Sequence, residues 1–405
     1  MINRLRAWGV KGVVTWAARF AQDMRIAIDL ILNDRKHRNS TPTRGITIVG
    51  PISGGYSLSK TLRDFSFALK KVGIPFQTYD TQGEKRALPR DYAEILTPRV
   101  NFDINRYDHI VEMVKSPLPE SVARGRRSRI VFWESESGLL DVYPYLVGDD
   151  TIIGMSDFNV AYFRKVLPPS TSVRKILYPL PPVKPNLKPV ADVRAKYGLR
   201  KDDFVVFYNF DLVAFARKNP DGVMRAFAQA FPHDDHTKLV FKVNNAANNP
   251  VHYEQLKSLA WELGITNRFM MIADYLSLDD VYALTNACDV YCSLHRAEGF
   301  GLGVAEAMSL GKPVVVTDWS STTEFCKPEN SIPVPCRKVP VGRNDYFIPL
   351  GAWAEADVVA ASEALRQLRE DPLFAKRIGS EARSFVENYF SAENFLRSVR
   401  KFLED

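Results

Sequence analysis

The sequence predicts an α/β fold with two Rossmann-like parallel-sheet domains that face a central cleft, preceded by an N-terminal helical extension. Its 405 residues exceed what one hydrophobic core usually supports. Short β-rich runs alternate with helical stretches along the chain, which is the pattern of a parallel sheet. Seven prolines between residues 168 and 189 separate an earlier series of such runs from a later one. Because proline at this density is excluded from helix and sheet interiors, we expect an interdomain linker there.

The composition is that of a globular protein, with 46% hydrophobic and 25% charged residues. The four cysteines lack the C-x-x-C spacing of zinc or redox sites, so reduced, buried thiols in a cytoplasmic protein are expected. The net charge of +7 is compatible with an anionic partner such as a membrane surface, and no nucleic-acid recognition motif accompanies it. Neither an apolar run of about 18–20 residues nor a signal peptide is recognisable. We therefore expect a protein that works inside the cell without nucleic acid as a partner.

Residues 1–44 form the predicted extension. Apolar residues recur in it at helical spacing, with basic residues between them. These apolar positions are Ile2, Leu5, Trp8, Trp16, Phe20, Met24 and Ile28. Tryptophan with basic residues is typical of a helix on anionic lipid, so residues 1–40 are expected to hold the protein peripherally at the inner face of the cytoplasmic membrane. The alternative is a helix packed on its own domain or on a second copy of the chain in a homodimer.

The first domain is expected at residues 45–185. The β-rich run Ile46–Val49 leads through a glycine turn to a helical stretch at 58–72 and a second strand at Pro75–Tyr79, which is a βαβ unit. Further strand candidates are His109–Val111, Ile130–Trp133 and Thr151–Met155. The basic run Arg124–Arg129 is interpreted as a solvated loop, with an anionic acceptor site as the alternative.

The second domain is expected at residues 186–385, followed by a helix at 386–405 that packs back on the first domain. Its strand candidates are Phe204–Tyr208, Lys238–Val243, Phe269–Ile272, Val290–Ser293 and Pro313–Thr317. In such a pair of domains, ligands bind in the cleft at the carboxyl ends of the strands.

The most informative segment runs from Glu298 to Pro313. Its three glycines, at positions 299, 301 and 303, follow a strand and open a helix, so backbone N–H groups are exposed to an anion or to sugar hydroxyls. Glu298 lies at the mouth of this turn and Glu306 in the helix, where both carboxylates can accept hydrogen bonds from vicinal hydroxyls. The alternative is a glycine-rich turn with a helix-capping acid.

The pattern E-G-F-G-L-x-x-x-E-A-M-x-x-G-x-P-V-V in this segment resembles the signature of family 4 glycosyltransferases, which have the GT-B fold. The similarity is strong over residues 204–330 and weaker over 45–190. The resemblance implies that Glu298 lies near the hydroxyls of the donor sugar and that Glu306 binds the nucleotide ribose. It also implies that the sugar–diphosphate pocket is lined by the backbone of Gly299, Phe300, Gly301 and Leu302.

A basic pair, Arg217 and Lys218, precedes a predicted helix start and therefore adds its charge to the positive end of a helix dipole. Such a site would neutralise a leaving nucleoside diphosphate, and in the family an Arg and a Lys of this region, usually several residues apart, cradle it. The adjacency here makes Lys218 the firmer assignment, and a solvated basic loop is the alternative. Lys242 is a weaker candidate for the same pocket. Gly54 and Gly55 resemble the family's glycine-rich loop, which approaches the donor phosphate or the acceptor.

Two further segments of the first domain resemble family features. Phe132–Glu136 is similar to a Trp-x-Trp-Glu segment of polysaccharide-building members, and either Glu134 or Glu136 faces the cleft. Ser156–Asn159 is similar to a turn that lines the acceptor side. His295 lies close enough to the signature to touch substrate, or it is a packing residue.

The resemblance implies a retaining enzyme that moves a sugar from a nucleoside-diphosphate donor of unknown identity to a glycan or lipid-linked acceptor, in the synthesis of a bacterial surface polysaccharide. No metal or other cofactor is expected, since no clear D-x-D motif is present and His233–His236 is interpreted as a surface loop. The alternatives are a nucleotide-sugar epimerase of the same fold and a non-catalytic sugar-binding subunit.

Overall fold

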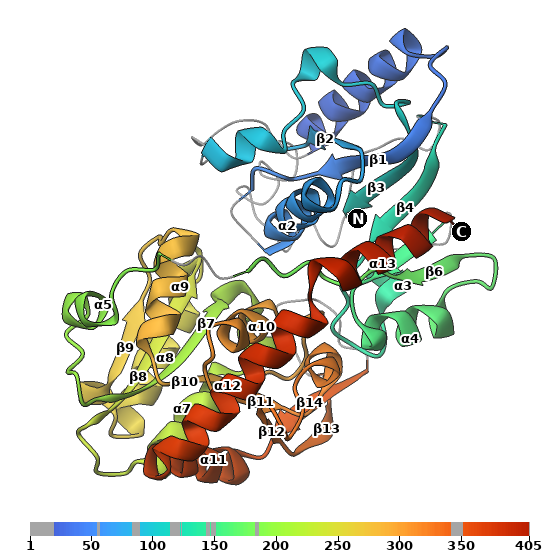
Figure 1. Ribbon diagram of the computed structural model, residues 1–405. Helices are drawn as coiled ribbons and strands as arrows, with labels where there is room; N and C mark the ends of the chain where they lie inside the picture. Colours follow the sequence, from blue (N-terminus) through green and yellow to red (C-terminus); the bar gives the residue numbers. More distant parts are fainter. Residues whose placement is uncertain are drawn as a thin grey trace.

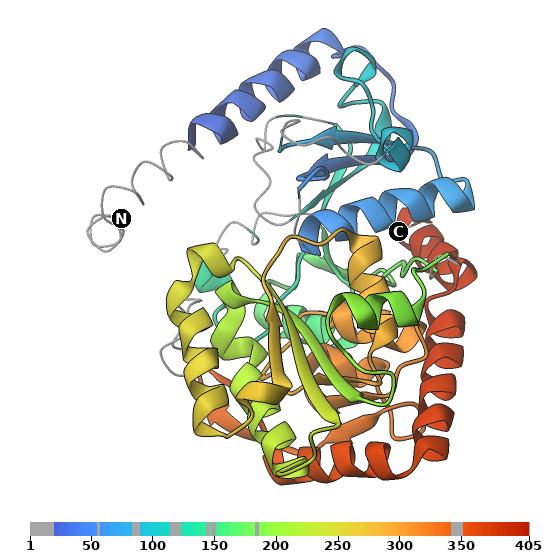
Figure 2. The same cartoon turned by 90° about the vertical axis from the view of Figure 1, so that its left-hand side faces the viewer.

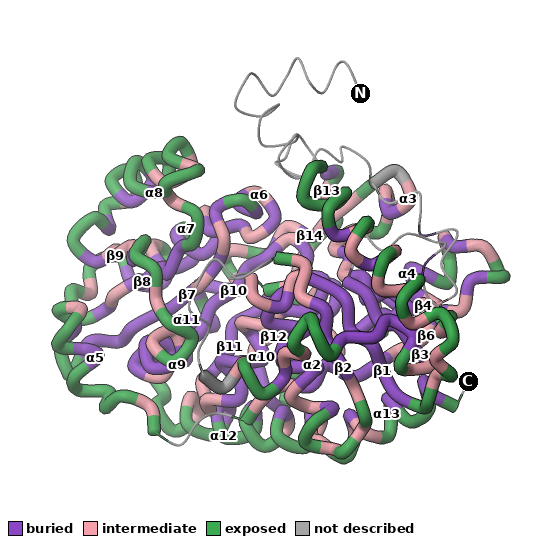
Figure 3. Tube along the Cα trace, turned by 90° about the horizontal axis from the view of Figure 1, so that it is seen from above, coloured by how far each residue is buried: buried purple, intermediate pink, exposed green. Residues whose placement is uncertain are grey.

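The computed structural model describes residues 20–54, 57–82, 90–113, 122, 124–142, 146, 151–182, 186–341 and 351–404. Its strands form two six-stranded parallel sheets and one antiparallel hairpin, each large sheet in its own half of the molecule (Figure 1). This arrangement confirms the predicted α/β class with two parallel-sheet domains. The strands of both sheets are buried beneath more exposed helices (Figure 3).

The N-terminal sheet has the strand order β2-β1-β3-β4-β5-β6. Its strands are β1 (Thr43–Gly50), β2 (Phe76–Asp80), β3 (Tyr107–Met113), β4 (Arg126–Ile130), β5 (Thr151–Gly154) and β6 (Ser172–Lys175). Besides a helix over residues 20–36, the helices described in this half are α2 (Ser57–Val72), α3 (Leu139–Val142) and α4 (Asp157–Val166). Strand β1, helix α2 and strand β2 are the βαβ unit that the sequence predicts.

The C-terminal sheet has the strand order β12-β11-β10-β7-β8-β9. Its strands are β7 (Phe204–Asp211), β8 (Thr237–Asn244), β9 (Phe269–Ile272), β10 (Val290–Ser293), β11 (Val314–Thr317) and β12 (Ile332–Val334). A hairpin of β13 (Cys336–Pro340) and β14 (Ala352–Ala356) follows. The helices are α5 (Val190–Lys196), α6 (Phe215–Lys218), α7 (Pro220–Ala230), α8 (Pro250–Glu262), α9 (Leu278–Ala287), α10 (Leu302–Ser309), α11 (Val358–Glu370), α12 (Pro372–Tyr389) and α13 (Ala392–Glu404).

The expectation for the basic run Arg124–Arg129 is wrong, because most of it lies in strand β4. Arg127 and Arg129 contact the Glu112 carboxylate on the neighbouring strand β3, at 2.9 and 3.3 Å. These arginines are therefore neither a solvated loop nor an acceptor site. The apolar residues expected to form this strand, after Ile130, lie beyond its end.

Residues 20–36 of the predicted N-terminal extension form a helix, and the last two residues of the extension already belong to β1. In this helix, Ile26 and Leu30 are buried with sheet residues, and the Asn33 side chain exchanges hydrogen bonds with Phe102 O and Ile104 N, each at 2.9 Å. The helix therefore covers its own sheet, on the side away from the C-terminal half (Figure 2). The tryptophans of the extension lie outside the described residues.

The last helix, α13, packs on the N-terminal half although it follows the C-terminal domain (Figure 1). The Phe395 ring contacts the Phe65 ring of α2 at 5.6 Å between centroids, and Ser398 Oγ accepts a hydrogen bond from Leu177 N at 3.2 Å. The chain thus passes between the halves twice, once through the proline-rich segment and once between α12 and α13.

Candidate active site

The signature loop lies between β10 and α10, at the carboxyl end of the C-terminal sheet. Gly301, just before α10, has a φ of 92°, and a Cβ atom there would lie 2.4 Å from Thr322 Cγ2. A Cβ atom on Gly303 would lie 2.5 Å from the Tyr291 hydroxyl. Both positions therefore require glycine, which explains why the turn and the helix start can pack so closely on the sheet.

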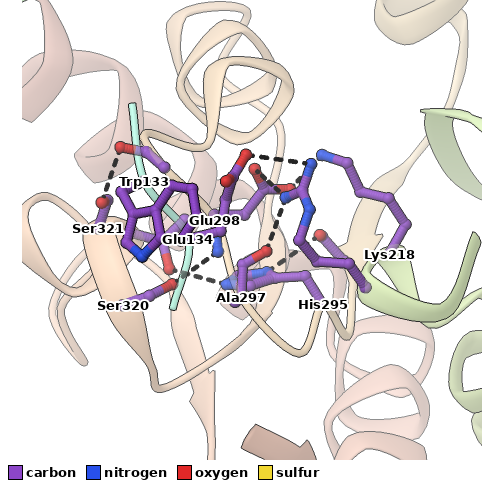
Figure 4. Close-up of polar contacts among 12 residues, drawn as sticks. Trp133, Glu134, Lys218, His295, Ala297, Glu298, Ser320 and Ser321 are labelled. Carbon is purple, nitrogen blue, oxygen red and sulfur yellow. Dashed lines mark hydrogen bonds and ion pairs between the residues drawn. The ribbon is translucent and has the colours of Figure 1, made fainter. Parts of the chain in front are cut away.

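Glu298 is the centre of a buried charge cluster (Figure 4). Its carboxylate pairs with Lys218 Nζ and with Arg217 Nη1, the latter at 3.3 Å. Arg217 Nη1 also donates to Ala297 O at 2.8 Å. The Glu298 backbone N–H donates to Ser320 Oγ at 2.9 Å. The structure thus brings together the three residues for which the sequence predicts a catalytic role.

The charge of Glu298 is stabilised by its neighbours. Burial alone would raise the pKa of its carboxyl, but Lys218 and Arg217 lower it to about 2. Lys218 ends α6, and Asn219 caps the following helix α7 by accepting a hydrogen bond from Gly222 N at 3.2 Å. The basic pair therefore lies where a helix dipole adds positive potential, as predicted.

Glu306 lies in α10, and its partners come from both halves. Its carboxylate is 3.3 Å from Lys60 Nζ of helix α2 and accepts a hydrogen bond from the Tyr282 hydroxyl at 2.9 Å. Lys60 also pairs with Asp64 at 2.5 Å, and the Tyr178 hydroxyl donates to the same Asp64 carboxylate at 2.7 Å. Burial raises the pKa of Glu306. Sequence reasoning missed Lys60, because no motif surrounds it.

The residues between the two acids differ in their surroundings. The Phe300 ring stacks on Tyr178 at 4.5 Å and contacts Phe390 at 5.7 Å between centroids, so its side chain belongs to an aromatic cluster between the halves. A Cβ atom on Gly299 would lie 3.1 Å from Phe132 Cβ of the N-terminal half. Leu302 opens α10 and is half-buried. The pocket-lining role of their backbone stays a prediction.

Two other predicted binding residues have contacts of their own. Lys242 Nζ, on strand β8, donates to Val243 O at 2.9 Å and to Asn244 Oδ1 at 2.8 Å, and no contact of the described residues joins it to Glu298. Gly54 lies after β1, and its carbonyl accepts a hydrogen bond from Arg63 at 2.7 Å. Gly55 lies outside the described residues.

The ambiguity between the two acids after Trp133 is resolved by their contacts. Glu134 Oε1 lies 3.5 Å from Arg217 Nη2, within the Glu298 cluster. Glu136 pairs instead with Lys338 of the hairpin at 3.0 Å, where both side chains are exposed. Glu134 is therefore the acid of the N-terminal half that joins the site.

The turn after β5 forms a further polar bridge between the halves. Ser156 Oγ and Ser321 Oγ are 2.8 Å apart, and Asp157 N donates to the Glu324 carboxylate at 2.6 Å. Lys175 Nζ is 2.9 Å from the same carboxylate. These contacts place the predicted acceptor-side turn against the loop after β11.

Within the described ranges, the one group of side chains with metal-ligand spacing is Asp202, Asp203 and His236. Arg200 Nε already pairs with Asp203 at 2.9 Å. The group lies before β7 and β8, at the ends of these strands away from Glu298. We assign no role to it.

His295 is a buried packing residue beside the cluster. Its ring nitrogens lie 3.3 Å from Ser293 Oγ and from Trp319 O. Burial is the main cause that lowers the pKa of this imidazole to about 4. The His295 ring is therefore neutral in the folded protein at neutral pH.

We predict a pH-dependent loss of stability from His295. In the unfolded chain its pKa returns to 6.5, so between that value and about 4 the unfolded state binds more protons. The contribution of the neutral ring is complete above pH 6.5 and disappears as the pH falls towards 4. It amounts to about 3 kcal/mol of unfolding free energy.

Urea unfolding at pH 7 and pH 4.5 should show a smaller decrease of the unfolding free energy for His295→Asn than for the wild type. His233→Asn, at an exposed position, should keep the wild-type decrease; equal decreases in all three proteins would contradict the prediction.

Comparison with known proteins finds a family match for the C-terminal domain, which carries Glu298, Glu306, Arg217 and Lys218. Residues 190–385 match the family "Glycosyl transferases group 1". Over 200 residues the chain is 25% identical to EpsD of Bacillus subtilis, a protein assigned to the glycosyltransferases, covering 49% of this chain and 45% of EpsD. Over 71 residues it is 34% identical to the lipopolysaccharide core biosynthesis mannosyltransferase LpsB of Rhizobium meliloti, covering 18% of this chain and 19% of LpsB. The matches thus span less than half the length of either relative.

Solved structures match a larger part of the chain. Sucrose-phosphate synthase of Thermosynechococcus elongatus has a TM-score of 0.62 at 17% identity, covering 89% of this chain and 99% of its own. HepE of Anabaena, in complex with UDP and glucose, has a TM-score of 0.63 at 16% identity. The match covers 89% of this chain and 100% of the HepE chain. None of the helices in the described ranges combines the length and hydropathy that a bilayer crossing requires. The C-terminal domain of the chain therefore matches the group 1 glycosyl transferases, and the two parallel-sheet halves together have the GT-B fold of the solved structures.

Proposed function

We propose that this glycosyltransferase moves a sugar from a nucleoside-diphosphate donor, with retention at the anomeric carbon, to a hydroxyl of a glycan or lipid-linked acceptor during assembly of a bacterial surface polysaccharide. The observation that carries the proposal is the buried Glu298 carboxylate between Lys218 and Arg217. This cluster lies beside the loop that opens α10, where backbone N–H groups suit an anion.

The chemistry requires a stabilised leaving group. When the bond between the anomeric carbon and the diphosphate breaks, its electron pair remains on the phosphate oxygen. Lys218, Arg217 and the start of α7 can stabilise that charge without a metal ion, because they are fixed in a largely buried site. The acceptor oxygen bonds to the same face of the sugar, and its proton passes to the departing diphosphate. Glu298 holds the two cations and accepts hydrogen bonds from sugar hydroxyls.

The relatives support this proposal at different levels. HepE was solved with UDP and glucose, which favours a UDP-sugar as the first donor to test. LpsB is a mannosyltransferase of lipopolysaccharide core biosynthesis, which favours a surface polysaccharide. Glu306 is the proposed ribose ligand, and the basic pair is the proposed diphosphate ligand.

The donor is identified by thermal-shift measurements against UDP-, GDP-, dTDP- and ADP-sugars. A ligand at one hundred times its Kd stabilises the folded state by about 2.7 kcal/mol, so one class should raise Tm clearly above the others. Chromatography of the donor after incubation with the protein then distinguishes a transferase from an epimerase and from a non-catalytic subunit. Conversion to an isomer without acceptor indicates an epimerase. Binding without any turnover indicates a non-catalytic sugar-binding subunit, and no Tm shift with any donor overturns the proposal.

A second part of the proposal concerns the helix over residues 20–36. Met24, Ile28 and Leu32 follow at intervals of four and are 47%, 51% and 57% exposed. The opposite face of the helix, with Ile26 and Leu30, is buried in its own domain. The helix therefore has two apolar faces, and Phe20 extends the outer one at 55% exposure.

Basic residues accompany this outer face. Arg25, Arg35 and Lys36 are exposed on the same helix. The same helix carries as many aspartates as basic residues, so the apolar stripe is the feature suited to a lipid surface, where its side chains would enter the boundary of the acyl chains and the basic residues would meet the headgroups. We propose that the enzyme binds the inner face of the cytoplasmic membrane in this way and so meets a lipid-linked acceptor.

The membrane proposal predicts that replacing Met24, Ile28 and Leu32 together by serine weakens vesicle binding at least about tenfold. The measurement is sedimentation with vesicles of phosphatidylglycerol and phosphatidylcholine. Trp261→Ser, at a 77% exposed position on α8, is the matched control and should bind like the wild type. Unchanged binding of the triple variant would refute the proposal, and a dimer that the triple variant separates would assign the stripe to a second copy instead. Deleting residues 1–40 is a poorer test, because Leu30 belongs to the core.

A further inference from the structure

Glu134 reaches the donor side of the cleft from the opposite domain. It follows β4 of the N-terminal sheet by four residues, yet its carboxylate lies 3.5 Å from Arg217 Nη2. A Cβ atom on Gly299 would lie only 3.6 Å from Glu134 Cγ. The side chain therefore lies against the first glycine of the signature and next to Glu298, as Figure 4 shows.

The segment that carries Glu134 is held rigidly. The Trp133 carbonyl accepts a hydrogen bond from Asn159 Nδ2 at 2.6 Å, and the Trp133 backbone N–H donates to Asn159 Oδ1 at 3.4 Å. The Trp133 indole is buried and donates from Nε1 to Ser137 O at 2.9 Å. These contacts fix the backbone from which the Glu134 side chain extends, and a fixed backbone is suited to orienting a substrate.

The exposure of Glu134 distinguishes it from Glu298. The Glu134 side chain is 24% exposed, whereas that of Glu298 is 9% exposed. Glu298 contacts both Lys218 and Arg217, while the ion pair of Glu134 is the 3.5 Å contact with Arg217. Glu134 is thus the carboxylate of the cluster that a substrate can reach and that Arg217 releases more easily.

The charges of the cluster indicate when the ion pair between Glu134 and Arg217 would break. Two carboxylates and two cations make the cluster of Glu134, Glu298, Arg217 and Lys218 neutral. A nucleoside diphosphate brings further negative charge, and a guanidinium prefers the bidentate contact that phosphate oxygens offer. In a complex with the donor, Arg217 Nη2 would turn to the diphosphate, which would leave the Glu134 carboxylate facing the cleft.

We infer that Glu134 binds the acceptor and orients its attacking hydroxyl, an inference that rests on the proposed sugar transfer. The released carboxylate accepts a hydrogen bond from this hydroxyl and directs the lone pair of its oxygen at the anomeric carbon. In the transfer step the acceptor oxygen bonds to that carbon, and the bond to the diphosphate breaks with its electron pair on the phosphate oxygen. As the new bond forms, the hydroxyl proton turns from the Glu134 carboxylate to an oxygen of the departing diphosphate, so Glu134 is ionised before and after the transfer. Binding of the donor thereby prepares the acceptor site.

The test compares Glu134→Ala with Glu136→Ala, a neighbouring acid that lies outside the cluster. The probes are UDP-glucose, or the donor that the thermal-shift screen identifies, water as the simplest hydroxyl acceptor, and octyl glucoside as a sugar acceptor. Glu134→Ala should lower kcat for donor hydrolysis and for any transfer by a factor of about 10 to 100, because a charge-assisted hydrogen bond to the nucleophile is lost. Its Kd for the donor should stay within threefold of the wild type. The kcat of Glu134→Gln, which keeps a hydrogen-bond acceptor oxygen without the charge, should lie between those of Glu134→Ala and the wild type.

Three results would overturn the inference. These are a Glu134→Ala variant that hydrolyses the donor as fast as the wild type, a tenfold weaker donor Kd in that variant, and an equal loss of kcat in Glu136→Ala. The second result would assign Glu134 to the donor site, and the third would indicate a general effect of charge at the cleft. A wild-type protein that binds no nucleotide sugar would instead refute the proposed function itself.

Discussion

Replacing Glu298 by glutamine is expected to lower the rate of sugar transfer by a factor of about 10² to 10³, which is the usual cost of losing one fixed electrostatic group at a reacting centre. The substitution keeps the shape of the side chain but removes the charge that holds Lys218 and Arg217. Both cations are then left without their shared counter-ion, and their positions relative to the diphosphate change. The measurement is kcat from release of the nucleoside diphosphate, with circular dichroism to show that the fold persists.

The control for this experiment is Glu363→Gln, since Glu363 is exposed on α11 in the same domain. It should leave kcat and the donor KM unchanged. Undiminished turnover in Glu298→Gln would show that the signature acid has no part in transfer and would move the reaction to another place in the cleft.

The largest effect on stability is expected at Arg194 in α5, the first helix of the C-terminal domain. Its side chain is buried against the end of α9 and the residue before β7. Its guanidinium donates to Ala287 O at 2.9 Å and to Asp203 O at 2.9 Å, and it pairs with Asp289 at 2.8 Å. The same Asp289 carboxylate accepts a hydrogen bond from Val205 N at the start of β7, at 2.7 Å. Arg194→Ala leaves two buried carbonyl oxygens without their donor, each at a cost of about 1–3 kcal/mol, and should therefore lower the unfolding free energy by about 2–6 kcal/mol.

Urea unfolding followed by tryptophan fluorescence measures this loss. Arg397→Ala is the matched control, because Arg397 forms an exposed ion pair with Glu393 one helical turn away. Its effect should stay below about 0.5 kcal/mol. Similar midpoints for the two variants would mean that the C-terminal domain does not depend on the buried guanidinium.

The parts of the site that the sequence predicts are those whose residues are neighbours in the chain. Strand β10, the glycine turn and the start of α10 follow one another, so the spacing of Glu298, Gly301 and Glu306 alone indicates a ligand-binding turn. Arg217 and Lys218 are also found from local pattern, since they precede the proline that opens α7.

The contacts between the halves are not predictable in this way. Lys60 meets Glu306 because two domains pack together, and a lysine in a helix has no local signature for that encounter. The start of strand β4 is not predictable for a related reason. A run of arginines is typical of a solvated loop, and only the pairing with β3 places the buried Glu112 beside them. Lys242 shows the converse, since its place at the end of a strand indicates a ligand site, whereas its ammonium group is bound within its own strand.

The two passages of the chain between the halves give the molecule an axis of rotation. Domain movements of this kind are hinge rotations carried by a few residues of the connecting segments, so two connections favour rotation about the line that joins them. Phe300 of the signature loop touches both passages, Tyr178 on the first and Phe390 on the second. The loop that precedes α10 therefore lies on this axis, where rotation displaces atoms least. Rotation about this line would leave the contacts of Phe300 with Tyr178 and Phe390 in place.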